Sequence, residues 1–150
     1  MKRSGLTIFL LLSLFFLASG VAFAQTFPDP QGYVSDFAGL LSAQGKEQIE
    51  GQLSQLEKDT TAEVAVVTVK SLEDSTIEDY ASRLFEKWGI GKEGKDNGVL
   101  FIIASEDRKV RIEVGYGLEP VLTDSRAGRI LDKDVVPFLK KNEYEKLSGE

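Results

Sequence analysis

The stretch KDNGVLFIIASEDRKVRIEVGYGLEPVLTD, residues 95–124, decides the fold of this chain. Residues 99–104 form a continuous apolar run of strand length, and residues 110–114 alternate apolar and charged side chains with the period of a half-buried strand. The polar residues 105–109 between the two runs are typical of a turn. The stretch therefore predicts a β-hairpin, in which the start of the first strand lies beside the end of the second.

The open end of this hairpin collects acidic, amide and glycine residues. Asp96 and Asn97 precede the first strand, residues 115–117 (Gly-Tyr-Gly) follow the second, and Glu119 and Asp124 lie a short loop further on. Carboxylate and amide oxygens are the ligands that hard cations bind, and glycines allow a ligand to approach the backbone closely. The open end therefore predicts a site for a hard cation or an anion.

The sequence before the hairpin adds a βαβ unit. Ser42 is a good N-cap for a helix that runs to about Lys58, and the valine-rich Glu63–Val69 predicts a buried strand. Thr76 begins a second helix, whose apolar residues follow a helical spacing as far as Trp88. We therefore expect an α/β fold: a single-domain sandwich with a central mixed β-sheet, built from the βαβ unit and the hairpin and flanked by helices.

A last helix is expected to begin at Asp124, whose side chain can cap it, and Pro137 would end or kink it. The free N–H groups and the dipole at the start of such a helix favour an anion, and Arg126 in its first turn could hold a phosphate. Helix capping is the simpler explanation of Asp124, and both interpretations stay open.

Two other candidates also have simpler structural explanations. Asp96 and Asn97 have the composition of a turn before a strand. Glu113 could pair with Arg111 or Lys109 on an exposed strand face. Neither explanation excludes a role in binding a cation.

The N-terminus has the pattern of a secretory signal peptide. Two basic residues precede an apolar segment over residues 6–17, and a small-residue cleavage motif ends at Ala24. The alternative is an uncleaved membrane anchor, but the apolar segment is short for a span that needs about 20 residues. We therefore expect an exported, periplasmic or extracellular protein. The expected division is a signal peptide (1–24), a lead segment (25–32) and one domain (33–150).

Composition excludes several classes of function. The net charge of the 150 residues is −6, and loss of Lys2 and Arg3 with the signal peptide lowers it to −8, so nucleic acid and anionic lipid are not expected as primary partners. The chain contains no cysteine and no histidine. Disulfides, a Ser-His-Asp triad and histidine ligation of zinc are therefore excluded.

Several segments form a set that resembles a known family. They are VSDFAGLLS (34–42), IEDYA (77–81), LFEKWGIG (84–91), DNGVL (96–100), VRIEVGYGLE (110–119) and LTD (122–124). As a set they resemble the TPM domain family, which occurs in exported bacterial proteins and in a thylakoid-lumen protein. Thr61 stands where the family often has glycine, and family members usually continue beyond the point matching Glu150 with another helix, many also with a transmembrane segment.

The resemblance implies an α/β sandwich that binds a divalent metal, mainly Ca²⁺, near the acidic sheet edge. It also implies acid phosphatase activity and a role in photosystem II repair for the plant branch. We expect an exported domain that binds Ca²⁺, or Mg²⁺ or another divalent cation, and acts as an accessory, repair or assembly factor for membrane-associated complexes. The expected ligands are Asp96, Asn97, Glu113, Glu119 and Asp124.

Two other functions remain open. One is a weak metal-dependent acid phosphatase that acts on phosphomonoesters, with Asp96, Asp124 and Arg126 in the catalytic roles. The other is an interaction domain whose acidic edge only keeps it in solution. The expected partners are accordingly a divalent cation, a phosphomonoester or a membrane protein complex, with membrane association supplied by sequence beyond residue 150.

Overall fold

The computed structural model describes residues 26–141, so the predicted signal peptide lies outside the described residues. In chain order the elements are β1 (Val34–Asp36), α2 (Ala43–Thr60), β2 (Glu63–Val69), α3 (Ile77–Trp88), β3 (Gly98–Ala104), β4 (Lys109–Val114), a 3₁₀ turn (Tyr116–Leu118), α4 (Asp124–Ile130), a π-helical turn (Leu131–Val135) and α5 (Val136–Leu139). The predicted hairpin is β3–β4, and the predicted βαβ unit is β2–α3–β3.

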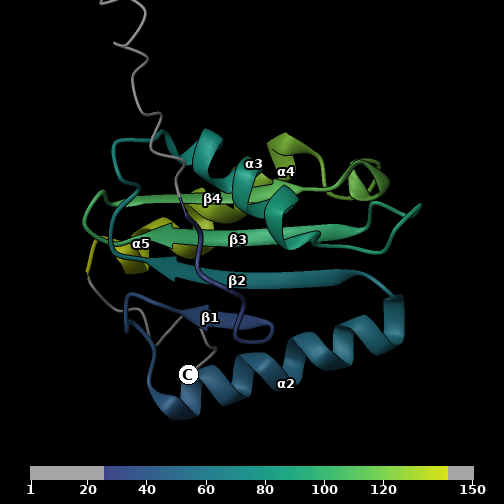
Figure 1. Cartoon of the computed structure of the whole chain (residues 1–150), viewed down its shortest axis with the longest axis horizontal. Coiled ribbons are helices and arrows are strands. Elements are labelled where there is room, and N and C mark those ends of the chain that lie inside the picture. Colours follow the sequence, from purple (N-terminus) through teal and green to yellow (C-terminus); the bar gives the residue numbers. More distant parts are fainter. Residues whose placement is uncertain (1–25, 142–150) are drawn as a thin grey trace, which may run out of the picture.

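The strands form one mixed sheet in the order β1-β2-β3-β4. β1 and β2 are parallel, β2 and β3 are parallel, and β3 and β4 are antiparallel. In Figure 1, α3 lies in front of the sheet, α4 and α5 lie behind it, and α2 runs along the β1 edge. The predicted fold, an α/β domain with a central mixed sheet, is confirmed.

Local capping explains where α2 and α3 begin and end. The Ser42 hydroxyl accepts a hydrogen bond from the Gly45 amide at 3.0 Å, and the Thr76 hydroxyl accepts one from the Asp79 amide at 3.2 Å. Thr61 caps the end of α2 with a φ of +65°. Glycine adopts this left-handed backbone without strain, which explains why glycine is common at this position in the family that the chain resembles.

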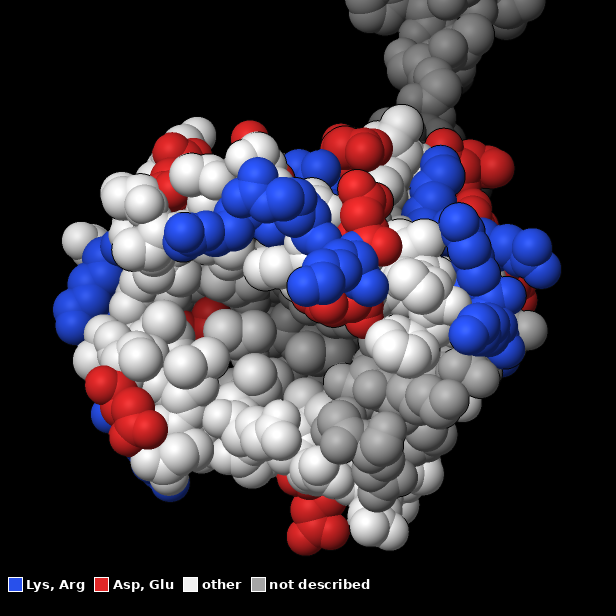
Figure 2. Space-filling view, turned by 180° about the vertical axis from the view of Figure 1, so that it is seen from behind, with Lys and Arg blue, Asp and Glu red and all other residues white. Residues whose placement is uncertain are grey.

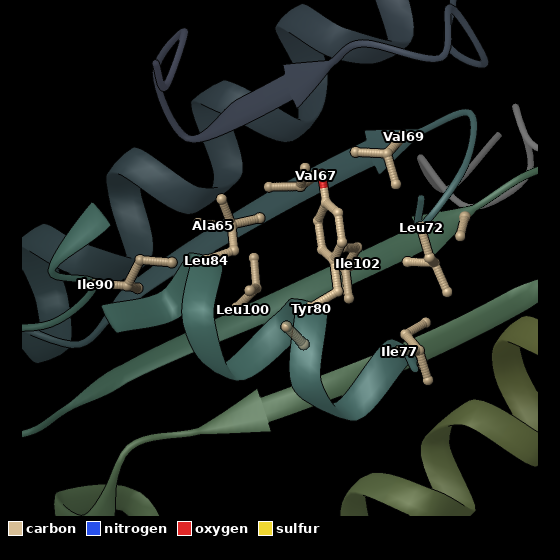
Figure 3. Close-up of a cluster of buried hydrophobic side chains, with 12 residues drawn as sticks. Ala65, Val67, Val69, Leu72, Ile77, Tyr80, Leu84, Ile90, Leu100 and Ile102 are labelled. Carbon is tan, nitrogen blue, oxygen red and sulfur yellow. The ribbon is translucent and has the colours of Figure 1, made fainter. Parts of the chain in front are cut away.

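The main core lies between α3 and the sheet (Figure 3). Leu84 of α3 packs in one cluster with Val67 of β2 and with Leu100 and Ile102 of β3, and each of these side chains is buried. Burial of a side chain of this size stabilises the fold by about 1.5–3 kcal/mol. The core therefore fixes α3 over the central strands.

The lead segment also contributes to this core. The ring of Phe27 lies edge-on to Tyr80 of α3, with 4.9 Å between the ring centroids. The indole N–H of Trp88 donates a hydrogen bond to the Pro28 carbonyl at 2.9 Å. Residues before β1 are therefore part of the packed domain.

β1 was not predicted from the sequence. Its Asp36 carboxylate accepts hydrogen bonds from the amides of Leu40 and Leu41, at 3.0 Å each, and from the hydroxyl of Thr68 on β2. These hydrogen bonds form a turn that ties the three-residue edge strand to its neighbour.

The last helix begins as predicted, but its cap differs. The Thr123 hydroxyl accepts a hydrogen bond from the Arg126 amide at 3.3 Å, and Asp124 is the first helical residue. The prediction that Asp124 is the N-cap was therefore wrong by one residue, because the threonine before it has the extended backbone that a cap requires. A π-helical turn precedes α5, which has Pro137 in its first turn.

Candidate functional site

A groove of about 790 Å³ lies between the C-terminal half of α3 and β4. Four predicted site residues, Asp96, Glu113, Glu119 and Asp124, line this groove. The lining is completed by Ser82, Phe85, Glu86, Gly89, Ile90, Gly91, Lys92, Glu93, Arg111, Ile112, Val114, Gly115 and Tyr116. The structure therefore brings four of the five predicted carboxylate and amide ligands to one concave surface.

Backbone packing at the end of the hairpin holds these residues together. The Gly117 amide donates to the Asp96 carbonyl at 3.0 Å, and the Gly115 amide donates to the Gly98 carbonyl at 2.8 Å. A Cβ on Gly115 would lie 2.2 Å from the Asp96 carbonyl oxygen, and one on Gly117 would lie 1.9 Å from that of Lys95. The glycines are needed for the close approach of the chain's own backbone, and the prediction that they admit a ligand stays a prediction.

Asp96 and Asn97 have different roles although they are adjacent. Asp96 is exposed with a φ of +47°, and it lines the groove. Asn97 is only 7% exposed. Its amide oxygen accepts from the Lys92 amide at 2.9 Å, and its amide nitrogen donates to the Thr61 carbonyl at 2.8 Å. Asn97 therefore stabilises the turn through its hydrogen bonds, and it is not among the residues that line the groove.

Glu113 pairs with its neighbour on the strand. Register places Glu113 opposite Leu100 and Arg111 opposite Ile102, so both point to the α3 side of the sheet. The Arg111 Nε atom lies 2.7 Å from a carboxylate oxygen of Glu113. The ion pair between Glu113 and Arg111 that was predicted as the simpler explanation is therefore present. The Glu113 side chain is 23% exposed.

Arg126 does not line the groove. Its guanidinium donates to the Val121 carbonyl at 2.5 Å, within the loop that leads to α4. Asp124 and Glu119 are exposed and do line the groove. The predicted association of Asp124 with a phosphate-holding Arg126 is thus not formed in the described conformation.

The groove is acidic. Six carboxylates line it, on Glu86, Glu93, Asp96, Glu113, Glu119 and Asp124, against two cations, Lys92 and Arg111. Both cations are in ion pairs, Lys92 with Glu57 of α2 and Arg111 with Glu113. Within residues 26–141, no three Asp or Glu side chains are close enough together to form a ready metal site.

A hydrogen-bonded cluster lies beside the groove wall. Glu57 accepts from Lys92 and from the Tyr33 hydroxyl, and these bonds lower the pKa of Glu57 below its ordinary value of 4.5. The same bonds to Glu57 raise the pKa of Lys92 and the pKa of Tyr33. The cluster connects α2, the chain before β1 and the turn after α3.

Two acidic groove residues, Glu86 and Glu93, were not singled out from the sequence, and they add charge to the α3 wall and the following turn. Tyr116 of the predicted Gly-Tyr-Gly segment stands at the rim with 80% of its surface exposed. The helical periodicity of α3 could have indicated Glu86, because Glu86 lies off the apolar stripe of that helix. Phe85, by contrast, is half-buried against the core and also lines the groove.

A second, more apolar cavity of about 300 Å³ lies at the opposite end of the hairpin. Its lining includes Ile103, Val110, Val136 and Leu139, with Arg108, Lys109 and Lys140 also present. Figure 2 shows the face behind the sheet, with a hollow whose upper rim carries Lys and Arg side chains. Among the described residues, the lining of this cavity contains none of the predicted carboxylate ligands.

The comparisons with known proteins agree with this architecture. A family model described as TPM domain matches residues 34–146. The chain belongs to the TPM domain family. The match begins at β1 and includes every strand of the sheet and every residue of the groove.

One relative with a similar sequence is a chloroplastic UPF0603 protein of Arabidopsis thaliana. It is 31% identical over 113 residues, which cover 70% of this chain and 40% of the relative. The chain thus spans less than half the length of that relative, and its name states a chloroplast location for that protein alone.

Two solved TPM-like folds are similar in structure. The solution NMR structure of the N-terminal domain of a P. gingivalis protein has a TM-score of 0.71 at 38% identity, covering 77% of this chain and 74% of that one. The corresponding domain of a Corynebacterium glutamicum protein has a TM-score of 0.62 at 18% identity, covering 83% and 78%. The second similarity concerns the fold alone. Among residues 26–141, no helix has the length and hydrophobicity to cross a membrane.

Proposed function

We propose that this TPM domain is a binding module of an exported protein, and that the α3–β4 groove binds a divalent cation, Ca²⁺ in the first place. The observation that supports the proposal most strongly is that Asp96, Glu113, Glu119 and Asp124 line one groove. Ca²⁺ takes six to eight oxygen ligands, which include waters and backbone carbonyls. A site with fewer than three carboxylates in direct contact is compatible with that chemistry.

The ion pairs of the groove indicate which carboxylates would take part. Glu113 already pairs with Arg111, so a cation that used Glu113 would have to displace a guanidinium. Asp96, Glu119 and Asp124 are exposed and carry no such pair among the described residues. We therefore assign Asp96, Asp124 and Glu119 the main part in binding, with Glu113 in a supporting role.

At the scale of the cell, we propose an accessory, repair or assembly role at membrane-associated complexes. The basis is the family resemblance together with the signal-like N-terminus, residues 1–24. N-terminal sequencing of the exported protein should give Gln25 as the first residue. Recovery of intact Met1 from the membrane fraction would contradict export with cleavage.

The phosphatase alternative has less geometric support. The Arg126 guanidinium is engaged by the Val121 carbonyl, and the surplus of carboxylates repels a phosphate unless a cation is bound first. If the domain is nevertheless a metal-dependent phosphatase, hydrolysis of p-nitrophenyl phosphate should be lost in Asp124→Ala and much reduced in Arg126→Ala. Turnover by highly purified protein that does not exceed the buffer rate would exclude this alternative.

The cation proposal is tested by thermal melting of EDTA-treated protein with added CaCl₂. A ligand present at 100 times its dissociation constant stabilises the native state by about 2.7 kcal/mol, so the melting temperature should rise by several degrees. The rise should be much smaller in the double variant Asp96→Asn, Asp124→Asn. The matched control is Asp132→Asn, an exposed position outside the groove, which should respond as the parent does. An unchanged melting temperature at millimolar CaCl₂ would contradict the proposal.

A further inference from the structure

The groove is open along the edge of the sheet. The consecutive residues 111–116 line this groove, together with Glu86 of α3 and Asp124 at the start of α4. Because α3 lies in front of the sheet and α4 lies behind it, a groove that reaches both follows the β4 edge (Figure 1). β4 is the last strand in the sheet order, so this edge has no strand neighbour among the described residues.

The hydrogen-bond pattern shows which backbone groups face the groove. The Gly115 amide donates to the Gly98 carbonyl, which makes Gly98 and Gly115 a hydrogen-bonded pair of the antiparallel ladder. Such pairs alternate along the ladder, so Glu113 and Arg111 also direct their backbone groups to β3. Ile112 and Val114 direct theirs outward. Within residues 26–141, no hydrogen bond to the backbone of either residue is formed beyond the sheet ladder.

Charge indicates what kind of chain fits this edge. Glu86 lies on the α3 side of the groove, and Asp124 lies on the other side at the start of α4. The two cations of the groove are already paired. A segment in the groove would therefore meet unpaired negative charge on both of its faces.

We propose that the α3–β4 groove binds an extended, lysine- or arginine-rich segment of a partner protein as an added strand against β4. Backbone groups of Ile112 and Val114 supply the ladder hydrogen bonds, and the groove carboxylates select basic side chains. The proposal goes beyond cation binding by naming the class of macromolecular partner, and it uses the same groove. A bound cation would compete for the same carboxylates.

The test uses the peptide acetyl-Lys-Val-Lys-Val-Lys-amide and protein kept in EDTA, so its result does not depend on cation binding. NMR titration should place the chemical-shift changes at residues 111–116, and hydrogen exchange of the Ile112 and Val114 amides should slow. A control peptide with glutamate in place of lysine should not bind. Changes confined to other surfaces, or equal binding of the glutamate peptide, would overturn the proposal.

Two N-methylated peptides separate strand addition from simple charge attraction. Alternate residues of an added strand face β4, so methylation of the valine amides and methylation of the lysine amides should have different effects. One form should bind about tenfold more weakly and the other should bind as the parent peptide does. Equal binding of both forms, whether strong or weak, would contradict an added strand.

A charge-reversed protein completes the test. Glu119→Lys with Asp124→Lys should abolish binding of the lysine peptide, whereas Asp132→Lys with Asp134→Lys, outside the groove, should leave it unchanged. Circular dichroism of both proteins checks that the fold is intact. Peptide binding without Ca²⁺ binding would contradict only the cation proposal. Ca²⁺ binding without peptide binding would contradict only the proposal of an added strand.

Discussion

At the scale of single residues, the glycines and the asparagine at the open end of the hairpin have structural roles, whereas several of the nearby carboxylates line the groove. Gly115 and Gly117 allow two backbones to meet, and Asn97 braces the turn between α3 and β3. Sequence alone could place Asp96 and Asp124 at one sheet edge. The sequence could not show that the Asn97 amide group is fully hydrogen-bonded, because that depends on where Thr61 lies in three dimensions.

The glycine at position 117 provides the first prediction. Gly117→Ala would place a Cβ 1.9 Å from the Lys95 carbonyl oxygen, so we expect a loss of about 1–3 kcal/mol in the free energy of unfolding. The control is Gly51→Ala in α2, where nothing lies within 4 Å and a gain of about 0.5–1 kcal/mol is expected. Urea denaturation measures both. Equal stability of the Gly117 variant and the parent would show that the backbones are not in contact there.

At the scale of elements, the long periodic segments were predictable and the short ones were not. The apolar stripe of α3 and the valine run of β2 carry their own signals, so their bounds were found from the sequence. β1 has only three residues and depends on pairing with β2 and on the Asp36 turn, neither of which leaves a local periodicity. The choice of Thr123 over Asp124 as the cap depends on a single extended backbone residue.

The contact between α2 and the groove wall provides a second prediction, on pH. Hydrogen bonds from Lys92 and Tyr33 lower the pKa of Glu57 in the folded state below its ordinary value of 4.5. A lowered folded-state pKa adds stability above the ordinary value, and that stability is lost as the pH falls through the folded-state pKa. Glu57→Gln should therefore be less stable than the parent at pH 7, with a difference that shrinks below pH 4.5.

Urea midpoints between pH 3 and pH 7 measure this difference directly, over a range chosen around the ordinary value of 4.5. Glu47→Gln is the matched control, because Glu47 is an exposed glutamate of the same helix. Its difference from the parent should stay small throughout. A difference for Glu57→Gln that is constant with pH would show that the charge of Glu57 does not contribute to stability.

At the scale of the whole molecule, charge is divided between two surfaces. Among the described residues, six carboxylates and two cations line the α3–β4 groove, whereas the cavity at the other end of the hairpin is lined by three cations and no carboxylate. The overall negative charge could be taken from composition, but this separation could not, because it depends on which sides of the sheet α3 and α4 cover. The acidic groove and the basic cavity are therefore two separate surfaces of the domain.

Repulsion among the groove carboxylates provides a third prediction. Glu119→Lys replaces a negative charge of the acidic groove with a positive one, so we expect the free energy of unfolding to rise by about 0.5 kcal/mol at low salt. The gain should vanish in molar NaCl, where charges are screened within about 3 Å. Glu106→Lys, in the mixed-charge turn between β3 and β4, should give no such gain. A loss of stability in Glu119→Lys at low salt would contradict the repulsion.

An NMR titration of the ¹⁵N-labelled domain with CaCl₂ shows whether the α3–β4 groove is the ligand site that we propose. We expect saturable shifts at the amides of Asp96, Glu119 and Asp124 and along residues 111–117, lost in Asp96→Asn with Asp124→Asn and kept in Asp132→Asn. Absence of saturable shifts at millimolar CaCl₂, or shifts confined to the face that carries α4 and α5, would contradict it.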